Sequence, residues 1–108
     1  MENIYEGVMF KVKGTVLRKG GEACAIQHEK GESWLMRGIP EGICSHAFAA
    51  MFPAYWVLRF GGKDPNEENP DEIHVQCSRK SCGATFLLER ISDEEAARMQ
   101  EEALATEA

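Results

Sequence analysis

Cysteine and histidine are the residues of this chain whose types and spacing could support chemistry. The sequence has four cysteines and three histidines. Most of them fall into three groups, Cys24-x3-His28, Cys44-x-His46 and Cys77-x4-Cys82. A chain without a secretion signal is expected to keep its thiols reduced, so these groups predict metal binding or thiol chemistry rather than a disulfide framework.

Four of these residues form a predicted metal site: Cys24, His28, Cys44 and Cys77. Zinc is the expected ion, with iron as the alternative, because thiolates and one imidazole can form a tetrahedron of ligands at about 2.0 to 2.3 Å. The ligands come from three separate elements, so one ion would hold short strands and a helix together. Cys82 is the alternative fourth ligand, in place of His28 or Cys44.

Two other interpretations of the thiols stay open. Reduced cysteines are among the most buried residue types, and Cys44 and Cys77 lie on predicted apolar faces, so both could be core residues. The thiols could also be reactive, with a Cys24–His28 or Cys44–His46 pair acting as an activated nucleophile. The remaining histidines are expected at the surface or in hydrogen bonds rather than as ligands.

The sequence offers little support for an enzyme. It contains no Gly-x-Ser-x-Gly elbow, no phosphate-binding loop, no Gly-x-Gly-x-x-Gly and no His-Glu-x-x-His. Its densest acidic cluster, residues 67–72, lies in a loop rich in proline and asparagine, where a solvated surface is the usual explanation. We therefore favour a non-catalytic protein, which could still be a subunit of an enzyme complex.

Two short strands are predicted before residue 40. Apolar residues alternate with other residues between Val8 and Val16, which predicts a strand that buries Val8, Phe10, Val12 and Val16. Residues 33–37 form the second predicted strand, between two glycine-containing turns.

A central helical segment follows Cys44. Its apolar residues have the spacing of one helix face: Ala47, Phe48, Met51 and Phe52. Ser45 is the predicted N-cap. Pro53 lacks an amide hydrogen, so the helix is expected to stop, kink or restart there. Residues 54–60 then form a second short helix or a strand, which Gly61-Gly62 ends.

Two more strands complete a small sheet. Alternating apolar residues predict a strand over 73–77 and another over 84–91, joined as a hairpin. Together these patterns predict an α+β fold with an antiparallel sheet of about four strands, one central helical segment broken at Pro53, and a C-terminal helix. We expect residues 1–91 to form the single domain.

Residues 92–108 are predicted to form an acidic C-terminal helix or tail. The segment opens with Ser92-Asp93-Glu94-Glu95, a capping-box sequence with acids in the first turn. Its only large apolar residues are Met99 and Leu104, so it is expected to dock weakly and to be dispensable for the fold.

Three motifs carry a resemblance to a known family: Cys24-x3-His28-x2-Gly31-Glu32-x-Trp34, Pro40-Glu41-Gly42-Ile43-Cys44-x2-Ala47-Phe48 and Leu58-Arg59-Phe60-Gly61-Gly62. In their order and spacing they resemble a family of short proteins of anaerobic bacteria and archaea that has no assigned activity. The resemblance covers about residues 8–91. It implies that the four predicted metal ligands form one set and that Cys82 is a local addition. The chain departs from the family after Gly62, over 78–83 and after Ile91.

Composition and charge narrow the choice of partners. The 108 residues are 44% apolar and 28% charged, as expected for one soluble globular domain. Six acids and one arginine follow Ile91, so the rest of the chain is close to neutral and has no basic face for nucleic acid. The main apolar stretch, 47–60, is shorter than the ~20 residues that span a bilayer, so no membrane is expected. We expect a cytoplasmic protein.

These observations predict a small zinc-binding, non-catalytic subunit or accessory module of a larger complex. One alternative is a thiol-dependent redox protein or small enzyme that uses Cys44 or Cys24. Another is a metal-free protein-interaction domain. A protein partner or a homo-oligomer is expected, because the neighbours Tyr55 and Trp56 cannot both point at one core. The exposed ring would act as an interface anchor, with Arg59 available to a partner's carboxylate.

Overall fold

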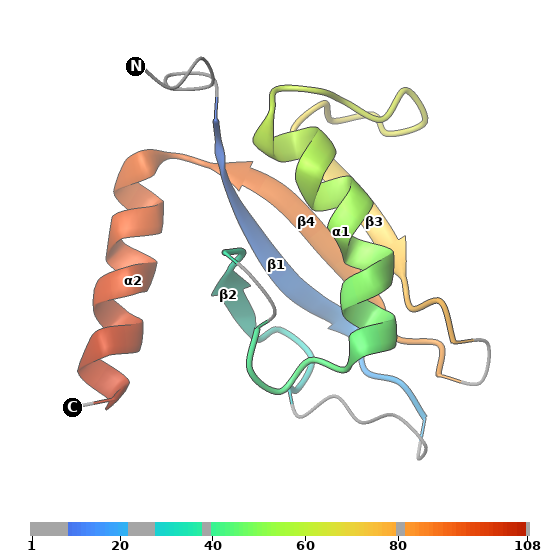
Figure 1. Ribbon diagram of the computed structural model, residues 1–108, viewed down its shortest axis with the longest axis horizontal. Helices are drawn as coiled ribbons and strands as arrows, with labels where there is room; N and C mark the ends of the chain where they lie inside the picture. The colour runs from blue at the N-terminus through green and yellow to red at the C-terminus, as the bar shows by residue number, and fades with distance from the viewer. Residues whose placement is uncertain (1–8, 22–27, 38–39, 80–81, 108) are drawn as a thin grey trace, which may run out of the picture.

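The computed structural model describes residues 9–21, 28–37, 40–79 and 82–107. In these residues the elements are β1 (Lys11–Arg18), β2 (Ser33–Leu35), α1 (Ser45–Arg59), β3 (Glu72–Gln76), β4 (Thr85–Ile91) and α2 (Asp93–Glu107). The strands form one antiparallel sheet in the order β2-β1-β4-β3 (Figure 1). This arrangement confirms the predicted α+β fold with four antiparallel strands and two helices.

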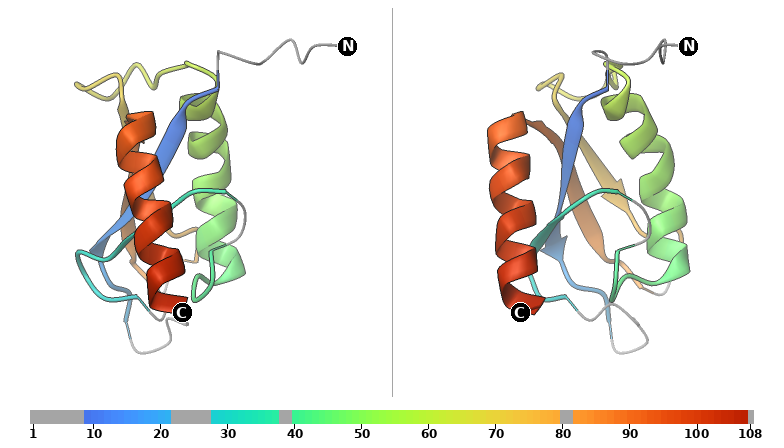
Figure 2. Two further views of the ribbon diagram at one scale, coloured as in Figure 1. Left: turned by 90° about the vertical axis from the view of Figure 1, so that its left-hand side faces the viewer. Right: turned by 60° about the vertical axis from the view of Figure 1, so that its left-hand side comes forward.

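The two helices lie on opposite sides of the sheet (Figure 2). Alternate residues of a strand point to opposite faces, so one parity of β1 and β4 faces α1. The fully buried strand residues of that parity are Val12, Val16, Phe86 and Leu88. They form one core cluster with the buried residues of α1, and α2 packs near β1 and β2 on the other side. The main core therefore lies between α1 and the sheet.

Trp34 of β2 lies across Gly14 of β1, and the two are register partners. A Cβ atom at position 14 would lie 2.9 Å from the Cε2 atom of the indole, closer than real Cβ atoms approach other atoms. The indole also meets the ring of Phe86 edge-on, with 6.4 Å between ring centroids. Glycine at position 14 therefore allows the indole to cover this end of the core.

α1 begins one residue earlier than predicted and does not break at Pro53. Cys44, not Ser45, is the N-cap, and its sulfur accepts a backbone N–H of the first turn at 3.4 Å. The helix continues through Pro53, which is exposed, so the missing hydrogen bond falls on the outer side. Met51 and Tyr55, one on each side of the proline, are buried against the sheet and hold both halves in one helix.

The C-terminus of α1 follows the sequence prediction. Gly61 adopts a φ of 82°, the left-handed conformation that glycine tolerates. The N–H of Gly62 donates to the carbonyl of Val57 at 2.8 Å, and the N–H of Gly61 donates to that of Leu58 at 3.2 Å. This pair of bonds is a Schellman motif, which satisfies two of the last carbonyls of the helix.

Arg90 of β4 fastens this end of α1 to the sheet. Its Nη1 donates to the carbonyls of Leu58 at 3.1 Å and Gly62 at 2.6 Å, and its Nη2 donates to that of Pro70 at 2.6 Å. Its Nε pairs with Asp71 at 2.9 Å. A cation at the C-terminus of a helix also interacts favourably with the helix dipole. One side chain thus joins β4, the end of α1 and the following loop.

α2 is capped as predicted and docks through a small residue. The Ser92 hydroxyl accepts the N–H of Glu95 at 3.1 Å. The Glu95 carboxylate lies 3.2 Å from the ammonium of Lys13 in β1, and Ala96 is buried beside it. Leu104, one of the two large apolar residues of the segment, is 58% exposed. The helix therefore contacts the sheet mainly through its first half.

Candidate functional site

The predicted metal ligands lie partly within the described residues. His28, Cys44 and Cys77 are described, whereas Cys24 lies outside the described ranges. Among the residues that are described, no three His, Cys, Asp or Glu side chains gather closely enough to hold a metal ion. The four-residue site therefore stays a prediction.

His28 is held by hydrogen bonds at both ring nitrogens. Its Nδ1 lies 2.7 Å from a carboxylate oxygen of Glu32, and its Nε2 lies 2.7 Å from the carbonyl oxygen of Glu41. Partial burial acts to lower the pKa of His28, but these hydrogen bonds outweigh it and raise the pKa above 6.5. Both partners accept hydrogen bonds, so they favour the imidazolium form, which donates from both nitrogens and has no lone pair for a metal. The ring also stacks on Trp34, with 5.3 Å between centroids.

The described cysteines belong with the apolar core. Cys77 and Cys82 are buried in the core cluster, and Cys44 is partly buried against it. The sulfur of Cys44 accepts a backbone N–H in α1 and makes no hydrogen bond with His46, although both residues are described. This placement favours the interpretation of Cys44 and Cys77 as core residues over that of a Cys44–His46 nucleophile.

Aromatic side chains follow one another along α1 at intervals of four residues. They are Phe48, Phe52, Trp56 and Phe60, and we call them the aromatic ridge. Successive ring centroids are 5.8, 5.5 and 4.7 Å apart. Residues four apart are neighbours on a helix surface, so the rings form one continuous row.

The middle of the ridge is exposed. Trp56 is 48% exposed and Phe52 is 42% exposed, whereas Tyr55 is only 6% exposed. The prediction that one of the neighbours Tyr55 and Trp56 would be exposed is thus confirmed. The prediction that Phe52 shares the buried face is wrong. The buried stripe of α1 instead runs through Ala47, Met51, Tyr55 and Leu58. The spacing of these four residues was the sequence signal that could have identified the exposed face.

The exposed residues in the middle of α1 are all apolar. They are Ala49, Phe52, Pro53, Trp56 and Val57, and we call them the outer face of α1. Arg59 is the only lysine, arginine or acidic residue in the helix. A helix that is apolar on all sides is normally covered on all sides. In the part of the chain that the structure describes, the outer face of α1 is left in contact with solvent.

Arg59 lies beside the last two rings of the aromatic ridge. Its guanidinium is 5.5 to 5.7 Å from the ring centroids of Tyr55, Trp56 and Phe60. It donates to the Tyr55 hydroxyl at 3.2 Å and to the sulfur of Met9 at 3.5 Å. No described carboxylate pairs with it, since the ion pairs of the described residues involve other cations. Its use by a partner's carboxylate stays a prediction.

Phe10 joins this region instead of the core. The strand pattern predicted that its ring is buried, but the ring is exposed. Its N–H donates to the carbonyl of Arg59 at 2.7 Å, which ties the residue before β1 to the end of α1. The Phe10 ring lies 5.5 Å from the guanidinium carbon of Arg90. Phe10 precedes β1, which begins at Lys11, so its ring does not share the buried face of Val12.

Comparisons with known proteins found no matching family model, no similar curated protein and no similar solved structure. In the described ranges, neither helix is long and apolar enough to cross a membrane.

Proposed function

We propose that this protein is an interaction module that pairs with a second copy of itself through the outer face of α1. The observation that carries the proposal is the composition of that face. Five exposed residues over more than two turns are apolar, and two of them are large aromatics about half exposed. Large aromatic side chains at the centre of an uncharged surface are typical anchors of protein interfaces.

The face is complementary to itself. Its residues Ala49, Phe52, Pro53 and Trp56 have the spacing of a helix–helix seam. If two copies of α1 cross antiparallel about a two-fold axis between Phe52 and Pro53, each Trp56 lies opposite Ala49 of the other copy. A large side chain then meets a small one on both sides of the axis, which is the self-complementarity that a symmetric interface needs.

Charge also favours a second copy as the occupant. The outer face has no charged group of its own, so it offers no partner to a charged surface. A charged partner would have to lose hydration without gaining an ion pair, which is costly. The same face of a second copy carries no such cost.

The expected affinity is moderate. Covering the exposed parts of Phe52 and Trp56 in both copies removes roughly 400 Å² of apolar surface from water, which is about 10 kcal/mol. Association costs at least about 4 kcal/mol, so at most about 6 kcal/mol remains, which corresponds to a dissociation constant of about 40 µM or weaker.

Sedimentation velocity over about 10 µM to about 1 mM protein tests the proposal. The wild type should shift from monomer to dimer within that range. Trp56→Glu should stay monomeric, because it places a carboxylate in the seam, whereas the control Leu104→Glu adds the same charge at an exposed residue of α2 and should still dimerise. Thermal midpoints check that both variants are folded.

A size exchange tests the geometry of the seam. Ala49→Trp alone and Trp56→Ala alone should each weaken the dimer. The double variant should recover it, because a large side chain again lies opposite a small one. A wild type that stays monomeric, or a folded Trp56→Glu that dimerises like the wild type, would show the proposal to be wrong.

The zinc-binding function stays a separate prediction that does not depend on this interface. It needs Cys24, which lies outside the described residues. The proposed interface corresponds to the metal-free interaction domain among the sequence-based alternatives and requires no ion.

A further inference from the structure

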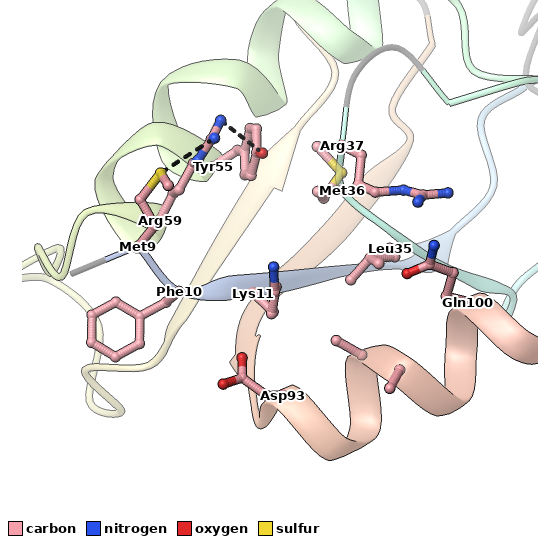
Figure 3. A pocket seen from close by; sticks show the side chains of 12 residues that line it. Met9, Phe10, Lys11, Leu35, Met36, Arg37, Tyr55, Arg59, Asp93 and Gln100 are labelled. Carbon is pink, nitrogen blue, oxygen red and sulfur yellow. Dashed lines mark hydrogen bonds between the residues drawn. The ribbon is translucent and has the colours of Figure 1, made fainter. Parts of the chain in front are cut away.

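A cleft of about 280 Å³ opens where β2 ends, between α1 and α2. Figure 3 shows its polar lining residues, which are Lys11 of β1, Arg37 after β2, Tyr55 and Arg59 of α1, and Asp93 and Gln100 of α2. The rest of the lining is apolar: Met9, Phe10, Leu35, Met36, Ala96 and Ala97. The cleft thus combines a polar rim with an apolar surface.

The lining carries a positive excess. Its three cations are Lys11, Arg37 and Arg59, against one acid, Asp93. None of the three cations forms an ion pair with any acid that the structure describes. Lys13, two residues further along β1, shows the contrast, because it is paired with acids of β4 and α2. Lys11 and Arg37 are therefore available to an anion, whereas Arg59 already donates to Tyr55 and Met9.

Tyr55 supplies a hydrogen-bond donor from a buried residue. Only 6% of the residue is exposed, and its hydroxyl oxygen accepts a hydrogen bond from Arg59 at 3.2 Å. The hydroxyl hydrogen itself goes to no acceptor within the described residues. In Figure 3 the hydroxyl and the Lys11 ammonium both project into the open part of the cleft. Because the hydroxyl opens onto the cleft, it can donate its hydrogen to a ligand bound there.

We propose that this cleft binds the carboxylate of a ligand whose body is apolar. The carboxylate accepts hydrogen bonds from the Lys11 ammonium and the Tyr55 hydroxyl. The apolar body lies along Leu35, the last residue of β2, and Met36, which follows it.

The chemistry of the lining selects a carboxylate over a phosphate. The apolar wall would gain nothing from inorganic phosphate, but it can cover a short hydrocarbon chain. A carboxylate of this kind could come from a small metabolite or from an acidic side chain of a protein, and both would use the same donors.

Binding is tested by NMR titration of the full-length protein with hexanoate, using hexanol and inorganic phosphate as comparisons. Hexanoate should bind saturably with a dissociation constant of about 1 mM, and it should shift the amide signals near Lys11 and Tyr55. Hexanol has the same chain without the charge, so it should bind at least about tenfold more weakly. Phosphate should also bind weakly.

Two variants and one control test the assigned donors. Lys11→Met should weaken hexanoate binding about tenfold, and Tyr55→Phe should weaken it about threefold to tenfold, because each removes one hydrogen-bond donor. Lys30→Met removes a lysine that lies outside the lining and should leave the affinity unchanged. Lys11→Met is the more secure test of the two. Within the described residues the Lys11 side chain forms no hydrogen bond or ion pair that the substitution would remove, so the fold should be unchanged.

Two outcomes would contradict the proposed carboxylate site. The proposal is wrong if hexanol or phosphate binds as tightly as hexanoate, or if folded Lys11→Met and Tyr55→Phe bind hexanoate like the wild type. A peptide blocked at both ends, with one glutamate between two leucines, distinguishes the sources. Tighter binding of the peptide than of hexanoate identifies a protein carboxylate, and the reverse identifies a small molecule.

This site does not depend on the proposed dimer. Lys11 and Tyr55 are not part of the outer face of α1. The monomeric Trp56→Glu variant should therefore bind hexanoate with the wild-type affinity. Failure of the carboxylate site would leave the dimer untouched, and failure of the dimer would leave the carboxylate site untouched.

Discussion

Replacement of Arg90 by methionine should destabilise the fold strongly. The Arg90 side chain is only 11% exposed, and it donates hydrogen bonds to the backbone carbonyls of three residues, Leu58, Gly62 and Pro70. Methionine keeps most of the aliphatic stem but removes every donor. The carbonyls at the end of α1 would then lose the cation that satisfies them.

The size of the effect follows from those contacts. A hydrogen bond to a charged group contributes about 1.5 to 3 kcal/mol, and water can replace part of it at the more exposed carbonyls. The ion pair with Asp71 adds little, because that carboxylate is well exposed. We expect a loss of about 3 kcal/mol in the free energy of unfolding, which is about 12 °C in the thermal midpoint of a domain this size.

Thermal and urea unfolding, followed by circular dichroism, measure the effect. Arg98→Met is the matched control, because Arg98 forms only exposed ion pairs on α2 and should change the stability by less than about 0.5 kcal/mol. Arg90→Lys should be intermediate, since one ammonium cannot serve three diverging carbonyls. If Arg90→Met and Arg98→Met shift the midpoint equally, the fastening of α1 by Arg90 is wrong.

His28, Gly14 and the predicted zinc ligands can each be tested directly. The pKa of His28 is raised above 6.5, so the stability that this residue contributes is fully present below about pH 6.5 and is lost as the pH rises through its folded-state pKa. The difference in stability between the wild type and His28→Asn should therefore be larger at about pH 6 than at about pH 9. Gly14→Ala should displace the Trp34 indole and lower the thermal midpoint, with a change in tryptophan fluorescence, whereas Gly31→Ala, which has open space but a positive φ, should leave the indole in place. If Cys24, His28, Cys44 and Cys77 bind zinc, elemental analysis of the purified protein should give about one zinc per chain. A chelator should then speed alkylation of the thiols. Metal-free protein whose alkylation is unchanged by the chelator would refute that site.

The elements that depend on local signals could be predicted from the sequence. The end of α1 at Gly61-Gly62 and the cap at Ser92 each rest on hydrogen bonds within a few residues. The sheet strands follow the alternation of apolar residues, which burial on one face requires. Local patterns are enough in these cases because the residues that decide the structure are neighbours in the chain.

The departures at Pro53 and Phe10 involve contacts between distant segments, whereas the one at Cys44 is local. Pro53 is a local signal for a break, yet α1 continues because Met51 and Tyr55 are buried against the same sheet. Cys44 caps α1 although serine is the more usual capping residue, which shifted the predicted start by one. Phe10 follows the alternating pattern but precedes β1. Its position is set by the hydrogen bond from its N–H to the carbonyl of Arg59, a residue far away in the sequence.

The cleft that we propose to bind a carboxylate could not be predicted from the sequence. Lys11 lies in β1, Arg37 lies after β2 and Tyr55 lies in α1, and no spacing between them forms a motif. Their proximity depends on the position of the last turns of α1 against β1. That position is set by the N–H of Phe10 on the carbonyl of Arg59 and by Arg90 on the carbonyls beyond it.

The same turns of α1 also set the outer face. Tyr55 and Trp56 are adjacent, so the rotation that buries the Tyr55 ring and aims its hydroxyl into the cleft also turns Trp56 outward. Arg59 contacts both rings, within 5.7 Å of each centroid. The buried and exposed aromatics are therefore two consequences of one helix orientation. Contacts with Phe10 before β1 and with Arg90 of β4 fix that orientation, and the apolar composition of α1 alone would leave it undetermined.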